Sequence, residues 1–138
     1  MKQDIAFVDF RNLSLPQKPN WFLSLPESGS FKSKNAADGP SFDVPVEQLK
    51  EHLQRLLGDE PRLTVHLASD DGLKYEVIVR TAVLRFPDRV SIEIVSLGEK
   101  KSGVALFSRS IYGYSDFGAN RKRGLNWLQR LSRSIQRG

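Results

Sequence analysis

One short segment of the chain concentrates the side chains that could do chemistry. Residues 108–123 read Ser-Arg-Ser-Ile-Tyr-Gly-Tyr-Ser-Asp-Phe-Gly-Ala-Asn-Arg-Lys-Arg. Such a density of hydroxyl, guanidinium, carboxylate and amide groups exceeds what a connection between two elements needs. The segment is therefore either a binding site or a hydrogen-bonded structural junction.

The first interpretation is an anion site. The segment lies just before an apolar-periodic helix, and the start of a helix offers unpaired backbone amides and a partial positive charge. Guanidinium and hydroxyl groups beside that helix start would complete a cradle for a phosphate or a carboxylate. The candidate ligand-binding residues are Arg109, Ser110, Tyr112, Ser115, Asp116, Asn120 and Arg121.

The interpretation that we prefer for the same segment is a structural network. Asp116 is itself an anion at the expected helix start, so it can cap the helix. It can also accept a bidentate hydrogen bond from Arg109 or Arg121. A segment whose polar groups satisfy one another in this way leaves no room for a ligand.

The chain offers no assembled catalytic set. Its two histidines, His52 and His66, fall in a predicted helix and a predicted strand, and it has no cysteine. The spacing of Gly113, Ser115 and Gly118 is not that of a nucleophile elbow, and no phosphate-binding or dinucleotide loop occurs. We therefore expect no metal and no cofactor. The enzyme alternative is a small hydrolase or transferase acting on a phosphorylated or carboxylated metabolite, with Arg109 and Arg121 as anion clamps.

The charge of the chain, +5 in total, is uneven. Residues 98–138 hold nine Lys and Arg against two acids, whereas residues 1–97 hold twelve basic residues and fourteen acids. On the last predicted helix, basic residues gather on one side, and the candidate contacts to an anionic surface are Arg123, Arg130, Arg133 and Arg137. Such a helix can contact an anionic membrane surface, or simply form a solvated face. Nucleic acid is not an expected partner, because no recognised nucleic-acid-binding module is present.

Hydrophobic periodicity predicts the helices and strands that hold these residues. One helical face is predicted from Val46, Leu49, Leu53, Leu56 and Leu57, with the side chain of Asp43 as N-terminal cap, Pro45 in the first turn and Gly58 as the stop. Four strands are then predicted over residues 63–67, 75–84, 90–95 and 104–109. Short turns between them favour an antiparallel meander.

The last helix is predicted to begin between Asp116 and Ala119 and to end near Ile135. Its apolar sector contains Phe117, Gly124, Trp127, Leu128, Leu131 and Ile135. A glycine on an apolar helix face indicates close approach to the neighbouring element. The predicted fold is α+β: an antiparallel meander sheet of about four strands packed by two helices. An irregular, proline-punctuated arm over residues 1–41 packs on the single domain formed by residues 42–138.

Three ordered blocks of sequence carry a resemblance to a known family. They are Pro19-Asn20 with residues 39–45 (Gly-Pro-Ser-Phe-Asp-Val-Pro), residues 84–88 (Leu-Arg-Phe-Pro-Asp), and the segment 108–121. Together they resemble the bacterial domain-of-unknown-function family 1499 from about residue 18 onward. The resemblance implies no activity, cofactor or substrate. Relatives often carry a basic residue at the position of Ile111, so any anion binding that uses this position would be weaker here.

The resemblance also bears on location, since many relatives have an N-terminal hydrophobic segment before this domain. The chain as written predicts a cytoplasmic protein, and an envelope-associated one if an anchoring segment has been removed. We expect a non-enzymatic binding or interaction domain for an anionic ligand or partner. The partner would be a small anionic ligand, a protein or an anionic membrane surface, and no feature of the sequence indicates an oligomeric state.

Overall fold

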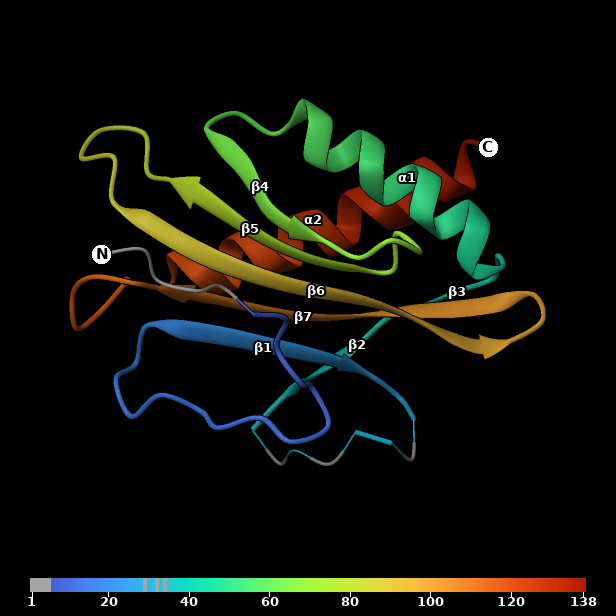
Figure 1. Ribbon diagram of the computed structural model, residues 1–138, viewed down its shortest axis with the longest axis horizontal. Helices are drawn as coiled ribbons and strands as arrows, with labels where there is room; N and C mark the ends of the chain where they lie inside the picture. The colour runs from blue at the N-terminus through green and yellow to red at the C-terminus, as the bar shows by residue number, and fades with distance from the viewer. Residues whose placement is uncertain (1–5, 29, 32, 34) are drawn as a thin grey trace.

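The computed structural model describes residues 6–28, 30, 31, 33 and 35–138. Along the chain its elements are β1 (Trp21–Pro26), β2 (Ala37–Gly39), β3 (Ser41–Phe42), α1 (Val46–Asp59), β4 (Leu63–Ala68), β5 (Lys74–Arg80), β6 (Pro87–Gly98), β7 (Lys101–Ser110) and α2 (Ala119–Gln136). Strands β4 to β7 follow one another as an antiparallel meander, and the chain then crosses back as α2 (Figure 1). The predicted α+β class and the meander are both confirmed.

The sheet is larger than the four strands predicted. Its order is β2-β1-β7-β6-β5-β4, with β3 also paired to β7. All pairs are antiparallel except β1 with β2. The extra strands come from residues 21–42, most of which were predicted to form an irregular arm. The run Trp21–Leu25 lies between Pro19 and Pro26, and prolines are typical of irregular segments, so the sequence alone does not indicate a strand there. The unpaired edge of β7 provides the partner that makes it a strand.

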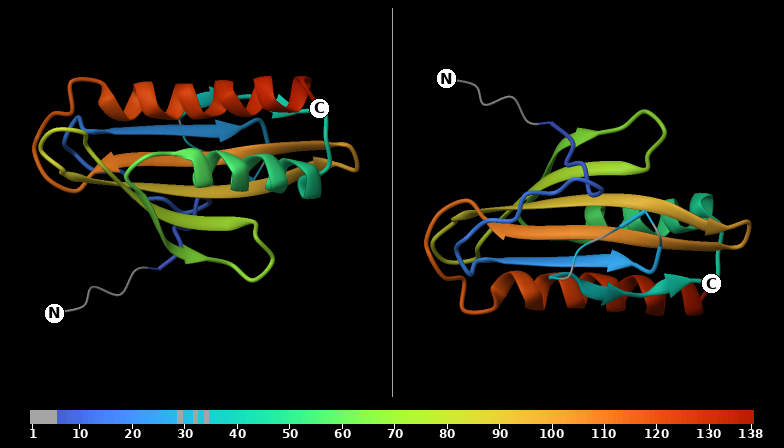
Figure 2. Two further views of the ribbon diagram at one scale, coloured as in Figure 1. Left: turned by 90° about the horizontal axis from the view of Figure 1, so that it is seen from above. Right: turned by 90° about the horizontal axis from the view of Figure 1, so that it is seen from below.

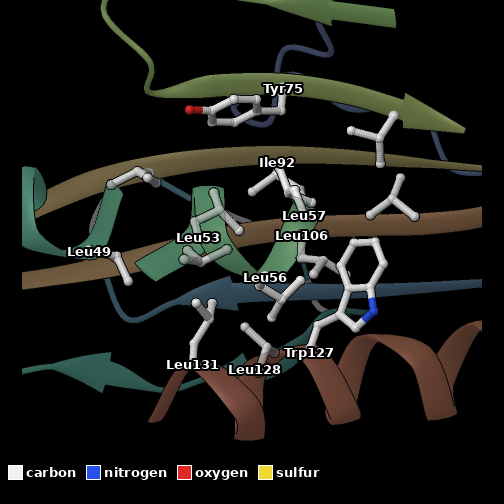
Figure 3. Close-up of a cluster of buried hydrophobic side chains, with 14 of the residues drawn as sticks. Leu49, Leu53, Leu56, Leu57, Tyr75, Ile92, Leu106, Trp127, Leu128 and Leu131 are labelled. Atoms are coloured by element: carbon white, nitrogen blue, oxygen red, sulfur yellow. The ribbon is translucent and has the colours of Figure 1, made fainter. Parts of the chain in front are cut away.

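Both helices cover one face of the sheet (Figure 2). The apolar face predicted for α1 is buried there, and Leu49 and Leu53 lie against the leucines and Trp127 of α2 and against Ile92 and Leu106 of the sheet (Figure 3). Gly124 of α2 is the point of closest approach, as predicted. A Cβ atom added there would lie 2.5 Å from Cδ2 of Phe22.

The opposite face of the sheet is covered by the N-terminal arm (Figure 2). Phe10 packs with Leu23 and Leu25 of β1 and with Ala105 and Phe107 of β7 in a second apolar cluster. Alternation along β1 and β7 therefore sends successive side chains into two different cores. This alternation also decides which polar side chains of β7 can meet.

Three predicted boundaries differ from the structure. Asp43 makes no capping hydrogen bond, because α1 has Pro45 at its N-cap position and starts at Val46. The helix passes Gly58 and ends at Asp59, where Glu60 is extended in front of Pro61, as the residue before a proline tends to be. Strand β5 ends at Arg80 rather than at residue 84, because the backbone of Thr81 pairs with that of Phe86 and closes a loop.

Neither helix of the described chain combines the length and the apolar character that crossing a membrane would require.

Candidate functional site

The centre of the segment 108–123 is Asn120, whose side chain is fully buried. Its amide oxygen accepts hydrogen bonds from the hydroxyl of Ser108 at 2.6 Å and from a guanidinium nitrogen of Arg123 at 3.0 Å. Its amide nitrogen lies within 3.0 Å of Ser110 Oγ, of the carbonyl oxygen of Asn20 and, at 2.6 Å, of an Asp116 carboxylate oxygen. One side chain thus ties β7, α2 and the residue before β1 together.

Asp116 fixes the start of α2. One carboxylate oxygen accepts from the backbone amide of Gly118 at 2.8 Å, and the other accepts from the amide of Asn120 at 3.2 Å. The capping role expected for Asp116 is therefore present, but its side-chain partner is Asn120 instead of Arg109 or Arg121. The amides that would have held an anion at this helix start are engaged by the protein itself.

Arg123 completes this network on the side of β6. Its second guanidinium nitrogen donates to the buried carboxylate of Asp88 at 2.8 Å. The Arg123 side chain is 14% exposed and that of Asp88 is 5% exposed. Removing one partner of such a pair would leave a buried charge without compensation, so Arg123 serves the fold and not an external surface.

Arg109 lies on the other face of the sheet. It follows Ser108 in β7, so its side chain points away from α2 and toward the face covered by the arm. Its guanidinium donates to Ser91 Oγ at 2.9 Å and stacks 4.3 Å from the ring centroid of Phe107. Ser91 in turn donates to the buried carboxylate of Glu76, which also pairs with Arg89.

This buried position changes the ionisation of Arg109. Burial first, and then the nearby charge of Arg89, lower the pKa of its guanidinium to about 10, while Glu76 opposes the shift. Arg109 is therefore still protonated at neutral pH. Its charge is held against Ser91 and an aromatic ring beneath the arm.

The remaining candidate residues of the segment are also dispersed. Arg121 leaves α2 toward β1, where its guanidinium lies 5.6 Å from the ring centroid of Phe22. Tyr112 is 65% exposed in the loop before α2, and Ser115 Oγ accepts from the amide of Phe117 at 3.3 Å. The structure brings Ser110, Asp116 and Asn120 together, but it places Arg109 and Arg121 on opposite faces of the sheet.

The predicted arginine stripe of α2 is divided as well. Arg123 is paired with Asp88, and Arg130 pairs with Glu60 beyond the end of α1 at 2.6 Å. Arg133 and Arg137 lie together at the C-terminal end of the helix. The four arginines are therefore not equivalent contacts to one flat surface.

A feature that the sequence analysis missed lies at the end of the sheet where α2 begins. Loops 81–86 and 111–118 both lie at this end of the sheet (Figures 1 and 2), and the amide of Ile111 donates to the carbonyl of Pro87 at 3.2 Å. Together they expose a group of side chains that we call the apolar tip: Val83, Leu84, Phe86, Ile111, Tyr112, Tyr114 and Phe117. Exposed apolar side chains are normally scattered singly, so such a cluster calls for an explanation.

The backbone of the apolar tip is held in uncommon conformations. Arg85 has a φ of 59° and Phe117 a φ of 52°, in the left-handed region that side chains other than glycine rarely adopt. Between the two loops lies a groove of about 440 Å³. The sequence analysis assigned Val83 and Leu84 to a strand, because an apolar run does not reveal whether its partner strand continues. It assigned Phe117 to the apolar face of the last helix.

The described residues that could bind a metal, and the two histidines, do not form a site. No three His, Cys, Asp or Glu side chains among them are grouped so as to hold a metal ion. His66 is exposed on β4, and His52 is buried on α1, far from residues 108–123 in the fold.

Comparison with protein families identifies a match over most of the chain. The family model described as "Protein of unknown function (DUF1499)" matches residues 13–131. This span includes the buried network around Asn120 and both loops of the apolar tip. No curated protein matches the chain.

Proposed function

We propose that this chain, which belongs to the DUF1499 family of proteins of unknown function, is a non-enzymatic binding domain whose partner is an anionic membrane surface. The observation that carries the proposal is the exposure of the apolar tip. Phe117 is 93% exposed and Val83 is 87% exposed, so these side chains project largely into solvent, although both border the groove between the two loops. Projecting apolar side chains suit insertion into the headgroup region better than enclosure of a small ligand.

The composition of the apolar tip supports the same partner. Aliphatic side chains (Val83, Leu84, Ile111) stand beside Tyr112 and Tyr114, and tyrosine is enriched where an apolar phase meets water. Burial of one large apolar side chain contributes roughly 1.5–3 kcal/mol. A few such side chains are enough for reversible attachment.

The charges around the apolar tip select for an anionic surface. Arg85 lies within one loop, and Arg121 and Lys122 lie in the first turn of α2. The nearby acids, Asp88 and Asp116, are engaged by Arg123 and by backbone amides of α2. Each basic residue held near an anionic leaflet contributes about 1 kcal/mol, and salt weakens this attraction.

The alternative of a hydrolase or transferase required Arg109 and Arg121 to clamp one anionic group. These side chains lie on opposite sides of the sheet, with Arg109 of β7 against Ser91 and Arg121 of α2 over Phe22. Their arrangement therefore favours a binding role without catalysis.

Co-sedimentation with vesicles tests the proposal. The protein should bind vesicles that contain phosphatidylserine and should bind neutral phosphatidylcholine vesicles much more weakly. Replacing two projecting side chains, Leu84→Gln with Phe117→Gln, should reduce vesicle affinity about tenfold or more, since each 1.4 kcal/mol corresponds to a factor of ten. The melting temperature should hardly change, because both side chains are exposed.

The matched control replaces two exposed apolar residues outside the tip, Val65→Gln with Leu125→Gln, which are 46% and 45% exposed. This control should bind vesicles as the unmodified chain does. Absence of binding to anionic vesicles at low salt would overturn the proposal, and so would an equal loss of affinity in the control.

A further inference from the structure

We propose that a hollow at the C-terminal end of α2 binds a phosphate group through Arg55, Arg133 and Arg137 and through the hydroxyl of Ser134. The hollow has a volume of about 450 Å³, and Arg130 and Gly138 complete its lining. Arg55 comes from α1, whereas Arg133 and Ser134 come from α2 and Arg137 is the C-cap residue of that helix. Two helices therefore direct cations into one space.

Three of the four arginines that line this hollow, Arg55, Arg133 and Arg137, make no salt bridge to another side chain among the described residues. Among the residues that the structure describes, Glu60 is the one carboxylate within salt-bridge distance of these arginines, and its partner is Arg130. A basic residue in the last turn of a helix is expected from the helix dipole, which accounts for Arg133. It does not account for Arg55, which belongs to the neighbouring helix and adds to the repulsion.

Ser134 gives the hollow a neutral hydrogen-bonding group held in place by a buried histidine. Its hydroxyl oxygen lies 2.5 Å from Nδ1 of His52, which is 8% exposed. When the imidazole carries its proton on Nδ1, it donates to Ser134 Oγ, and the serine hydrogen is then directed to another acceptor. An anion in the hollow would be that acceptor.

The arrangement favours a phosphate over a carboxylate. A phosphate monoester carries up to two negative charges and three terminal oxygens, so it can accept from several guanidinium groups and a hydroxyl at once. A carboxylate has one charge and two oxygens and would leave part of the cationic lining uncompensated. The ligand class is therefore a phosphate or a phosphate monoester.

His52 provides a built-in reporter of occupancy. Burial lowers the pKa of its imidazole, the charge of Arg55 lowers it further, and Glu51 opposes the shift. A dianion beside Arg55 and Ser134 would offset the positive potential and raise this pKa toward its ordinary value. His66, the other histidine of the chain, is exposed on β4 and serves as an internal control.

The hollow is separate from the apolar tip. Ala119 at the first turn of α2 lines the groove between the tip loops, and Arg137 after the last turn lines the hollow. A helix of 18 residues is about 27 Å long at 1.5 Å per residue. The two sites therefore lie at opposite ends of the molecule, as the position of the C-terminus in Figure 1 illustrates, and each can be removed without the other.

The test follows the imidazole NMR signals of His52 and His66 while inorganic phosphate is added at constant ionic strength. The His52 signals should shift saturably at millimolar phosphate, and those of His66 should not. Arg133→Gln with Arg137→Gln should weaken phosphate binding at least tenfold. The matched control, Lys18→Gln with Lys100→Gln, removes two exposed positive charges elsewhere and should leave phosphate affinity unchanged.

Two further experiments distinguish a free phosphate from a lipid phosphate, and the hollow from the apolar tip. In the first, the Leu84→Gln, Phe117→Gln variant is mixed with phosphatidic acid vesicles to test whether a lipid phosphomonoester also occupies the hollow. If this variant binds the phosphatidic acid vesicles and loses that binding when Arg133→Gln and Arg137→Gln are added, the phosphate in the hollow can come from a lipid.

In the second experiment, the chain that carries only the two arginine substitutions should still bind phosphatidylserine vesicles through the apolar tip. No saturable His52 response to inorganic phosphate or to phosphatidic acid vesicles would overturn the phosphate site, and so would an unchanged response in the arginine variant.

Discussion

At the scale of single residues, one buried amide replaces the arginine–carboxylate pair that the sequence suggested. Asn120 accepts from Ser108 and Arg123 through its oxygen, and its nitrogen reaches Asp116 and Ser110. A buried polar side chain is stable only when its donors and acceptors are satisfied. Each group in this network therefore depends on the others, and substitutions within it should not have additive effects.

Asp116→Ala should lower the free energy of unfolding by about 1–2 kcal/mol, since it removes two hydrogen bonds to the amides at the start of α2 and one to Asn120. The melting temperature should fall by several degrees. Asp43→Ala is the matched control, because Asp43 is exposed and caps no helix. Differential scanning calorimetry would measure both. A change below one degree in Asp116→Ala would contradict a structural role for this network.

At the scale of elements, the pleat of β7 decides which neighbours in sequence become neighbours in space. Ser108 faces α2, and Arg109 faces the arm, so the two central residues of the predicted site belong to different layers. The same rule brings Phe22 of β1 beneath α2, where only a glycine leaves room for its ring. Helix α2 can therefore pack this closely on the sheet only because Gly124 has no side chain.

Gly124→Ala should destabilise the protein by about 1–3 kcal/mol, because the added methyl group would overlap the ring of Phe22 and force repacking. This loss should exceed the gain in helix propensity. Gly58→Ala in α1 is the matched control, since a Cβ atom there would meet nothing within 4 Å. The control should gain up to about 1 kcal/mol from propensity alone. Urea unfolding of the two variants should thus give effects of opposite sign, and a stabilised Gly124→Ala would refute the close contact.

At the scale of the whole molecule, the sheet is covered on both faces, by two helices on one and by the N-terminal arm on the other. The arm is anchored by Phe10 and also by charge. The amide of Val8 donates to Glu76 at 3.0 Å, and Arg11 donates to Glu93 at 2.9 Å. The arm therefore belongs to the folded domain, and it keeps the charged row of Glu76, Arg89 and Arg109 away from water.

Phe10→Ala should cost about 3–5 kcal/mol, the usual cost of removing a buried phenylalanine side chain. Phe117→Ala makes the same chemical change at a site that is 93% exposed, and it should alter stability by less than about 0.5 kcal/mol. Chemical denaturation followed by tryptophan fluorescence would compare them. Equal effects of the two substitutions would mean that the arm contributes nothing to the fold.

Elements with local periodicity could be predicted from the amino-acid sequence. The apolar face of α1, the apolar face of α2 apart from Phe117, the meander of β4 to β7 and the close approach at Gly124 follow from spacing along the chain, and the structure confirms them. The capping role of Asp116 was also predictable, because it depends on residues only two and four positions away.

Features that depend on a distant partner could not be predicted from the sequence and emerge from the folded chain. The run 21–26 becomes a strand because β7 offers an unpaired edge, and Val83 and Leu84 are exposed because their hairpin closes at Thr81 and Phe86. Likewise, Arg109 and Arg121 diverge across the sheet, whereas Arg55 meets Arg133 from another helix. Local propensity acts over a few residues, but exposure and charge clustering are set by contacts between segments far apart in sequence.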